Sequence, residues 1–316
     1  MAVFASILDL IGNTPTVDVS QLSSKPGVKI LAKLESWNPA GSVKDRIAMA
    51  MVRAADEAGD LQPGCVLLEP SSGNTGIALA MICRLRGYQL KIVLPESVTI
   101  ERRHALEAFG AEIISSPGPE GSNGAVRRAR QLAVENPDWV FLYQYANEAN
   151  PMVHYTTTGP EILCDVPDIT HFVAGLGTSG TLMGVGTYLK EHRPDVKVYA
   201  VEPPSGEHVE GLRSLDDGFV PPIFAKWGGI DLLDGKRIVR PVDSLIWTRR
   251  LAAEAGIFVG PSTGAALAGA AKVADRLEEG TVVFVVSDGG WKYLSTGLYS
   301  GDLDEAAATL EDVIYF

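Results

Sequence analysis

Two patterns of hydrophobic residues, one typical of strands and one of helices, alternate along most of the chain. From residue 64, short runs rich in Val, Ile and Leu are each followed by a longer segment with apolar residues at helical spacing. The first set comprises CVLLEP and TGIALAMICRLRG, LKIVLPE and IERRHALEAFG, AEIISSP and GAVRRARQLAVEN, and finally WVFLYQY. This alternation predicts parallel strands connected by crossover helices.

A second set of strand and helix patterns begins near residue 171. It comprises HFVAGLG and TLMGVGTYLKEHRP, VKVYAVEP, SLIWTRRLAAEAG, the short strand GIFVG with the helix after Pro261, and TVVFVVSDGG. Between the two sets, ANEANPMVHYTTTGPEIL is rich in Asn, Pro and Thr, which indicates a domain boundary near residues 145–150. We therefore predict an α/β protein with two open, doubly wound sheets, whose ligands bind at the carboxyl ends of the strands.

The composition narrows the function classes. A chain of 316 residues, 46% hydrophobic and 21% charged, is long enough for about two globular domains. Its formal charge of −12 argues against a nucleic-acid partner, which requires a dense basic surface. The longest apolar runs are too short to span a bilayer, and the first residues lack the basic segment of a signal peptide. We expect a cytoplasmic protein.

The cysteines give no sign of a disulfide or a metal site. Cys65, Cys83 and Cys164 are far apart in the chain and form no CxxC pair. We expect three buried free thiols in a reducing compartment, and no metal.

The segment NPAGSVKDR (residues 38–46) places a lysine where helices disfavour one. Ser42 and Asp45 have the spacing of a helix N-cap and its acidic partner, so Lys44 is expected in the first helical turn. The positive end of the helix dipole destabilises an ammonium group there. Taken alone, Lys44 is either an exposed lysine without a role or a functional amine, because function concentrates at residues that break a local rule.

Residues 69–76, EPSSGNTG, join a predicted strand to a helix and are crowded with polar groups. Ser71, Ser72, Asn74 and Thr75, together with backbone N–H groups at the start of the helix, offer the donors that a carboxylate or a phosphate requires. The same residues also suit a plain capped turn, so both interpretations stand.

Residues 175–181, GLGTSGT, match the GxGxxG pattern after a predicted strand, and Glu202 ends the next strand. One interpretation is a nicotinamide dinucleotide (NAD) site in an oxidoreductase, although this assigns no role to Lys44 or to the hydroxyl-rich turn. A cradle for a smaller phosphate-bearing ligand explains the same turn, either in another enzyme or in a non-catalytic binding module. Its residues are Gly177, Thr178, Ser179, Gly180 and Thr181.

Residues 260–264, GPSTG, match the nucleophile elbow of α/β-hydrolases. That class requires a histidine after the serine in the chain, whereas all five histidines precede Ser262, so we reject a hydrolase. Ser262 is instead expected to cap the helix that follows, a role compatible with ligand binding.

Together, IGNTP, NPAGSVKDR, PSSGNTG, GLGTSGT and GPSTGA occur in the order and spacing of a known family. Over essentially its whole length the chain resembles the cysteine synthase and cystathionine β-synthase family, the fold-type-II pyridoxal 5′-phosphate (PLP) enzymes. The resemblance implies two three-layer α/β/α domains of the tryptophan synthase β type. It assigns residues 1–11 and 35–146 to an N-terminal domain, and residues 12–34 and 147–316 to a C-terminal domain.

The resemblance also implies the site. Lys44 is the Schiff-base lysine, Asn74 contacts the 3′ oxygen of PLP, and Ser262 meets the pyridine nitrogen. The cofactor phosphate is held by residues 177–181. The substrate α-carboxylate is bound by Ser71, Ser72, Thr75 and Gln144. Position 71 departs from the family's usual threonine but keeps a hydroxyl.

The position of Lys44 at the positive end of a helix, which disfavours an ammonium group, then suits its chemistry. An amine must lose its proton to condense with an aldehyde, and the positive helix end together with burial lowers its pKa. Once the substrate displaces it, the amine is placed to remove the α-proton. A serine at the ring nitrogen stabilises a carbanion less than a carboxylate does, which favours loss of a β-leaving group to give an aminoacrylate. A sulfur nucleophile then adds to yield cysteine.

The leaving group is expected to be phosphate or acetate. EGLRSLDDGFVPP (210–222) and GGWKYLST (289–296) look most like bacterial M-type cysteine synthases that accept O-phosphoserine, and Arg213 falls where O-acetylserine enzymes carry an uncharged turn. A guanidinium suits a phosphate ester because it donates two hydrogen bonds and carries full charge. The alternative is a surface ion pair of Arg213 with Asp216 or Asp217.

By the same resemblance, the sulfur donor is sulfide or a thiocarboxylated carrier protein, and the enzyme is a homodimer. The C-terminal VIYF (313–316) either folds over the active site as a gate or packs on its own domain or at a dimer interface. Within the PLP class, the alternatives are O-acetylserine sulfhydrylase proper and the synthesis of diaminopropionate or cystathionine.

Overall fold

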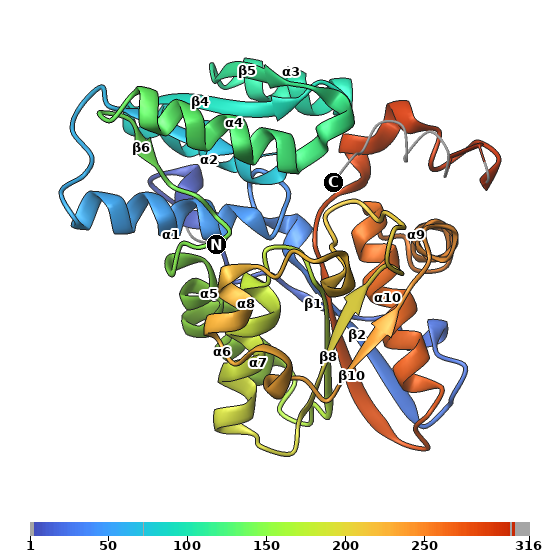
Figure 1. Cartoon of the computed structure of the whole chain (residues 1–316). Helices are drawn as coiled ribbons and strands as arrows, with labels where there is room; N and C mark the ends of the chain where they lie inside the picture. Colours follow the sequence, from blue (N-terminus) through green and yellow to red (C-terminus); the bar gives the residue numbers. More distant parts are fainter. Residues whose placement is uncertain (1–2, 72, 304, 307–316) are drawn as a thin grey trace.

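Two sheets of mainly parallel strands organise the molecule, and each is covered by helices on both faces (Figure 1). The structure is a computed structural model that describes residues 3–71, 73–303 and 305–306. The predicted α/β class, with two open doubly wound sheets, is confirmed.

The smaller sheet has four parallel strands in the order β5-β4-β3-β6. Its strands are β3 (Val66–Pro70), β4 (Gln89–Pro95), β5 (Glu112–Ser116) and β6 (Val140–Phe141). The helices of this part are α1 (Lys44–Glu57), α2 (Asn74–Arg86), α3 (Ile100–Ala108) and α4 (Gly121–Glu135). Alternate strand residues pack on α1 to α3 on one face and on α4 on the other, which explains why these strands read as nearly continuous apolar runs.

The larger sheet has six strands in the order β1-β2-β10-β7-β8-β9, all parallel to their neighbours except β1. Its strands are β1 (Thr16–Asp18), β2 (Val28–Leu34), β7 (His171–Gly175), β8 (Lys197–Glu202), β9 (Gly235–Ile238) and β10 (Gly280–Val286). Its helices are α5 (Ala149–Val153), α6 (Gly159–Asp165), α7 (Gly180–His192), α8 (Pro222–Lys226), α9 (Pro241–Ala255) and α10 (Pro261–Ala274). A π-helical turn, His154–Thr158, separates α5 from α6.

Short 3-10 helices occupy several of the connections. They are Ile7–Leu10, Ser20–Leu22, Glu35–Trp37, Gly118–Glu120, Leu215–Asp217, Gly229–Leu232 and Gly290–Thr296.

Strand β10 shows why the larger sheet has two cores. Val282 and Phe284 belong to the cluster formed with α10, whereas Val283 and Val285 belong to the cluster formed with α7. Successive side chains of a strand point to opposite faces, so an unbroken apolar run is what a strand buried on both faces requires.

The start of α1 is fastened to the larger sheet. The Val43 N–H donates to the Ser287 carbonyl over 2.8 Å, the Gly289 N–H donates to the Gly41 carbonyl over 3.2 Å, and Ser42 forms an isolated bridge with Asp288. Helix α1 itself packs against α2 and α5 and lies between the two sheets (Figure 1). Although β1 and β2 come early in the chain, they complete the larger sheet. The division at residues 11, 34 and 146 stays a prediction.

Several local expectations are wrong. The run GIFVG forms only an isolated bridge between Val259 and Gly289, because its neighbour is a loop rather than a strand. The run WVFLYQY contains only the two-residue strand β6. All three cysteines are free, but only Cys83 is buried; Cys65 is half-buried and Cys164 is exposed.

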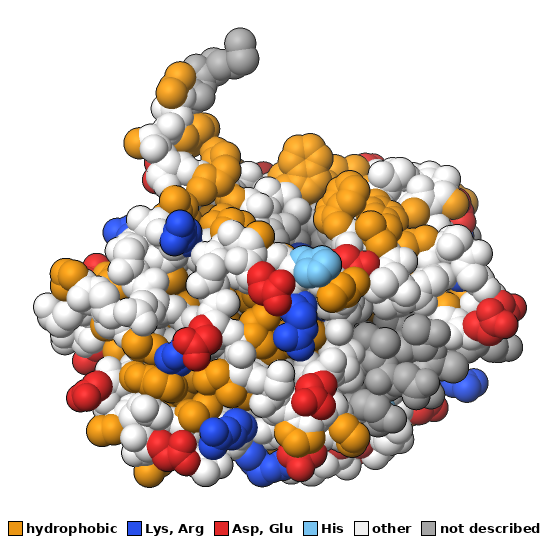
Figure 2. Space-filling model, turned by 90° about the horizontal axis from the view of Figure 1, so that it is seen from above, with side chains coloured by type: hydrophobic (Ala, Val, Ile, Leu, Met, Phe, Trp, Pro, Cys, Tyr) orange, Lys and Arg blue, Asp and Glu red, His pale blue; other side chains and the backbone are white. Residues whose placement is uncertain are grey.

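The surface shows no feature that changes the class. None of the described helices is long and apolar enough to cross a membrane. On the face shown in Figure 2, acidic and basic side chains of the described residues are interspersed, without a continuous basic area.

Candidate active site

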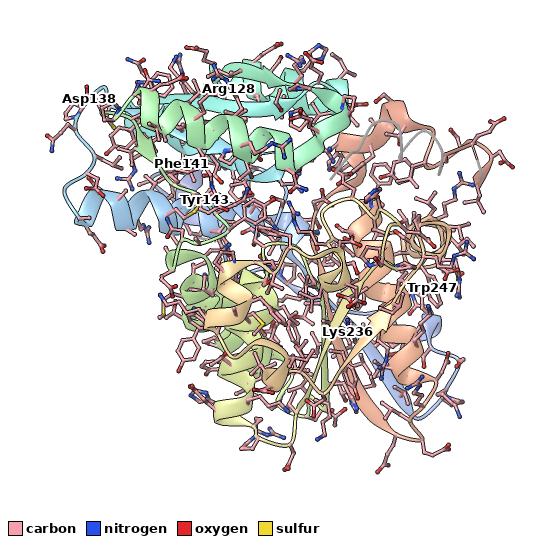
Figure 3. The ribbon with its side chains drawn as sticks, viewed as in Figure 1. Arg128, Asp138, Phe141, Tyr143, Lys236 and Trp247 are labelled. Atoms are coloured by element: carbon pink, nitrogen blue, oxygen red, sulfur yellow. The ribbon has the colours of Figure 1, made fainter. Side chains whose placement is uncertain are left out.

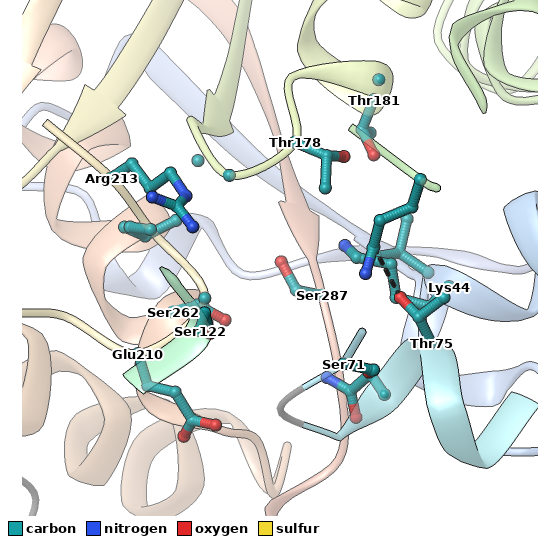
Figure 4. Close-up of a pocket in the computed structure, with 18 of the residues that line it drawn as sticks. Lys44, Ser71, Thr75, Ser122, Thr178, Thr181, Glu210, Arg213, Ser262 and Ser287 are labelled. Atoms are coloured by element: carbon teal, nitrogen blue, oxygen red, sulfur yellow. Dashed lines mark hydrogen bonds between the residues drawn. The ribbon is translucent and has the colours of Figure 1, made fainter. Parts of the chain in front are cut away.

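The four turns singled out in the sequence line one cavity. It measures about 1040 Å³, including the part open to solvent, and lies at the carboxyl ends of strands from both sheets. Every predicted site residue that the structure describes lines it: Lys44, Ser71, Asn74, Thr75, Gln144, Gly177, Thr178, Ser179, Gly180, Thr181, Arg213 and Ser262. Ser72 and the C-terminal residues 313–316 lie outside the described residues. Figure 4 shows Lys44 and Arg213 on opposite sides of the cavity.

Lys44 is the first residue of α1, as expected, but the helix is not capped as expected. The N-cap is Val43 rather than Ser42, because the backbone of Ser42 is already paired with Asp288. The Ser42 hydroxyl accepts from the Lys44 N–H and donates to Asp45, over 3.2 Å each. Asp45 accepts from the N–H of Ala40, so the reciprocal capping box is not formed.

The amine of Lys44 is easier to deprotonate than an ordinary lysine. Burial is the largest cause, and the net effect of burial and nearby charges is a pKa of about 8 for Lys44 instead of 10.5. Asp288 and, less strongly, Glu35 oppose this shift, whereas the positive charge of Lys292 adds to it. A buried amine with this pKa suits condensation with an aldehyde.

The turn after β3 is held by its own hydroxyls. The Oγ of Ser71 accepts from the N–H groups of Gly73 and Gly76 over 3.1 and 3.0 Å, as in a capped turn. A hydroxyl that accepts these bonds still has its own proton to donate to a ligand. Thr75 donates to the Gln144 side chain over 2.7 Å, which fixes both groups at the cavity wall. The two interpretations of this turn are therefore compatible.

Asn74 and Asp288 are hydrogen-bonded to each other, and each has one side-chain oxygen without a hydrogen-bond partner among the described residues. The Nδ2 of Asn74 donates to Oδ2 of Asp288 over 2.8 Å, and the Tyr293 hydroxyl donates to the same oxygen over 2.8 Å. Within the described part of the chain, Oδ1 of Asn74 and Oδ1 of Asp288 are buried and have no hydrogen-bond partner. Such atoms are rare in folded proteins, and because Asn74 lines the cavity, its unpartnered oxygen is an acceptor that a bound group can use.

The turn after β7 has the shape of an anion cradle. Ser179 adopts φ of +75°, a left-handed conformation that is uncommon outside glycine, directly before α7 begins at Gly180. A Cβ at Gly177 would lie 2.5 Å from the Gly211 carbonyl oxygen, and a Cβ at Gly180 would overlap the Asn150 side chain. Only glycine therefore fits at these two positions without displacing neighbouring groups, in a turn whose backbone N–H groups suit a phosphate.

Asn150 and His154 contact the two threonines of this cradle. Thr178 accepts from Nδ2 of Asn150 over 3.0 Å, and Thr181 lies 3.1 Å from Nε2 of His154. Burial lowers the pKa of His154 well below its usual range, so the ring stays neutral.

Ser262 lies at the cavity wall but does not cap α10. Pro261 is the first residue of the helix, which moves the N-cap back to Gly260 and leaves Ser262 in the first turn. Its hydroxyl lies near the Gly211 backbone, beside the turn that carries Arg213. The hydroxyl is therefore free of the capping role that the sequence suggested.

Arg213 points toward the cavity rather than toward the nearby acids. Its guanidinium donates to Asn123 over 3.3 Å and to the Tyr145 hydroxyl over 3.2 Å. It also lies over the rings of Tyr145 and Phe219, 5.1 and 4.7 Å from their centroids. Among the described residues Arg213 forms no ion pair, so pairing with Asp216 or Asp217 is wrong.

Glu202 is occupied elsewhere. It is fully buried, forms an ion pair with Lys236 (labelled in Figure 3) and accepts from the Leu215 N–H over 3.1 Å. It does not line the cavity, so it does not serve as the ribose ligand of a dinucleotide site.

The structure adds cavity residues to which the sequence analysis assigned no role. Ser122 from the first turn of α4, Glu210 beside Arg213, Ser287 after β10, and Tyr293 also line the cavity. Glu210 and Tyr293 belong to the segments 210–222 and 289–296 noted above, and glycines lie close to Ser122 and Ser287, but these patterns do not show which side chains face the cavity.

The donor set fits PLP. The cavity offers an amine with a lowered pKa, a hydroxyl and an amide that can face an aromatic ring, and a glycine-rich helix start for a phosphate.

Comparisons with known proteins agree with this set. Residues 7–288 match the family model described as pyridoxal-phosphate dependent enzyme. The chain is 42% identical over 312 residues to a probable cysteine synthase of Bacillus subtilis, covering 95% of this chain and 99% of the relative. It is 41% identical over 302 residues to cysteine synthase B of Pseudomonas aeruginosa, covering 94% and 98%. The solved structure of O-ureido-L-serine synthase matches with a TM-score of 0.87 at 38% identity, covering 97% of this chain and all of that chain.

Proposed function

The chain belongs to the pyridoxal-phosphate dependent enzyme family, and on this premise we propose that it makes L-cysteine from O-phospho-L-serine with Lys44 as the cofactor-bearing residue. It is a PLP-dependent, cysteine synthase-like enzyme of the β-replacement type. The interpretations as a nicotinamide-dependent oxidoreductase and as a non-catalytic binding module are therefore wrong.

PLP, when bound, supplies the electron sink that lets an amino acid lose its α-proton and its β-leaving group. The residues of the chain supply the rest. Lys44 accepts the α-proton, because burial lowers the pKa of its amine to about 8 and so makes the neutral form more available. Asn74 and Ser262 orient the cofactor ring, and residues 177–181 hold its phosphate. Ser71 and Thr75, with Ser72 and Gln144, bind the substrate carboxylate.

The positive charge of Arg213 is the reason for proposing O-phosphoserine as the substrate. Its guanidinium lines the cavity, donates hydrogen bonds to the neutral side chains of Asn123 and Tyr145, and lies over two aromatic rings. None of these partners is a carboxylate. A guanidinium that is not neutralised by an acid retains its full attraction for a phosphate ester.

The remaining parts of the proposal follow the family resemblance. Sulfide or a thiocarboxylated carrier protein supplies the sulfur, and the enzyme works as a homodimer in the cytoplasm, where its three free cysteines stay reduced.

Two measurements test the proposal. Borohydride reduction of the purified protein followed by mass spectrometry should place the cofactor adduct on Lys44; an adduct on another lysine contradicts the assignment. Parallel titrations with O-phosphoserine and O-acetylserine, each followed by the change in cofactor absorbance and by cysteine formation with sulfide, should show a higher kcat/KM for O-phosphoserine. A preference for O-acetylserine contradicts the choice of substrate.

A further inference from the structure

Lys292 is a buried lysine outside the residues that line the cavity. It lies in the 3-10 helix Gly290–Thr296, with only 8% of its surface exposed. Its Nζ donates to the carbonyl oxygen of Gly41 over 3.0 Å, and it forms no ion pair with any residue that the structure describes. Burial of a cation without a direct counter-ion is costly, so the position calls for a reason.

The acceptor of this bond belongs to the loop that leads into Lys44. Gly41 lies three residues before Lys44 and adopts φ of +79°. Its carbonyl accepts from two donors, the Gly289 N–H and the Lys292 ammonium. Hydrogen bonds from charged donors are the stronger kind, so Lys292 makes the firmer of the two contacts.

The backbone of Lys292 is itself fixed. The hydroxyl of Thr99, directly before α3, donates to the Lys292 carbonyl over 2.8 Å and is buried. Lys292 thus connects the start of α3 to the loop before α1, so that its ammonium group has a fixed position.

The charges around Lys292 couple it to the Lys44 amine. Burial lowers the pKa of Lys292, Asp288 and Asp45 oppose this shift, and Arg102 adds to it. Burial also raises the pKa of Asp45 to about 6, which weakens that acid as a counter-ion. Asp288 is therefore the main acid facing both lysines, and the positive charge of Lys292 lowers the pKa of Lys44.

We propose that Lys292 is a positioning residue for Lys44: its ammonium holds the Gly41 carbonyl in the loop that leads into Lys44, and its positive charge favours the neutral form of the Lys44 amine. Because Lys44 bears the cofactor only in the proposed function, the role of Lys292 depends on that assignment. Lys292 does not line the cavity and acts through Lys44.

The test compares four variants by their effect on the Lys44 amine itself. Lys292→Met loses the charge and the donor, Lys292→Gln loses the charge but keeps a donor, and Lys292→Arg keeps both. Lys272→Met is the matched control, because the Nζ of Lys272 also donates to a carbonyl, that of Ile238, but at the surface. The full-length protein is freed of PLP with hydroxylamine, and competitive acetylation of Lys44 is followed by mass spectrometry across pH.

The titration midpoint of Lys44 should rise by about half a pH unit or more in Lys292→Met and Lys292→Gln, because a nearby positive charge is lost. It should stay at the wild-type value in Lys292→Arg and Lys272→Met. In the holoenzyme the acid limb of the kcat profile should move in the same direction, with KM little changed.

An unchanged Lys44 midpoint in Lys292→Gln overturns the proposal, as does a rise of equal size in Lys292→Arg or in the control. If Lys292→Met fails to fold, the comparison of Lys292→Gln with Lys292→Arg decides. The labelling uses neither cofactor nor substrate. A missing shift with the borohydride adduct on Lys44 therefore overturns this proposal alone, whereas an adduct elsewhere overturns the proposed function.

Discussion

The guanidinium of Arg102 forms an ion pair with the carboxylate of Glu210, and both side chains are almost completely buried. Arg102 belongs to α3, which packs on the smaller sheet, whereas Glu210 lies in the loop after β8 of the larger sheet. The same guanidinium lies over the ring of Tyr293, 4.8 Å from its centroid. The pair thus links the two parts of the molecule beside the cavity, which Glu210 also lines.

Replacement of Glu210 by alanine should destabilise the protein strongly. Loss of one member of a buried ion pair typically costs about 3–5 kcal/mol, because the other charge stays buried. Urea denaturation at neutral pH measures the change. Glu278→Ala is the control, since Glu278 faces Lys25 in an ion pair but its side chain is 96% exposed, and the expected loss is below about 0.5 kcal/mol. Similar losses in the two variants would show that the Arg102–Glu210 pair adds little.

Glu35 should make the stability of the protein depend on pH in the acid range. Burial by itself raises the pKa of Glu35, but Arg46, Thr14 and Asn38 together lower it more, so the net pKa lies below its usual value of 4.5. An acid with a lowered folded-state pKa stabilises the protein above its unfolded-state pKa, and this contribution is lost as the pH falls through the folded-state value.

The comparison of wild type with Glu35→Gln isolates this contribution. The difference in unfolding free energy should be largest above about pH 5 and should narrow as the pH falls below about 4.5. Urea denaturation at about pH 7, 5.5 and 4 measures it. A difference that stays constant over this range would mean that Glu35 does not titrate differently in the two states.

Arg213→Ala should impair turnover of O-phosphoserine far more than turnover of O-acetylserine. Loss of a charge-assisted hydrogen bond to phosphate corresponds to about a 10- to 100-fold fall in kcat/KM, whereas the acetyl ester should lose less than about threefold. Arg213→Lys should give an intermediate value for O-phosphoserine, because it keeps the charge but not the planar fork. Equal losses with the two substrates would remove Arg213 from the recognition of the leaving group.

Gly177→Ala should weaken PLP binding. The added Cβ would lie 2.5 Å from the carbonyl oxygen of Gly211, so the phosphate turn and the 211–213 turn must move apart. We expect at least about a tenfold loss of PLP affinity, measured by titration of the cofactor-free protein. Gly186→Ala in α7 is the control, because its nearest neighbours are side-chain carbons of Leu232 and Val198 at 3.2 Å, which can shift. Affinities that fall equally in both variants would contradict the model of the cradle.

The sequence alone determined the fold class and the position of most cavity residues. Parallel strands buried on both faces must be continuous apolar runs, and their turns must carry the glycines and hydroxyls that a ligand needs, so both signals are local. Lys44 could be placed in the first helical turn for the same reason, since helix starts have a short-range pattern.

Only the tertiary structure decided which charges surround that lysine. Asp288 and Lys292 come from a segment more than two hundred residues away in the chain, and the patterns of that segment do not show that the two residues face Lys44. The same holds for the helix start at Val43, where the long-range pairing of Ser42 with Asp288 moved the cap by one residue. A pKa depends on burial and on charges in space, and these are fixed only when the two sheets are brought together.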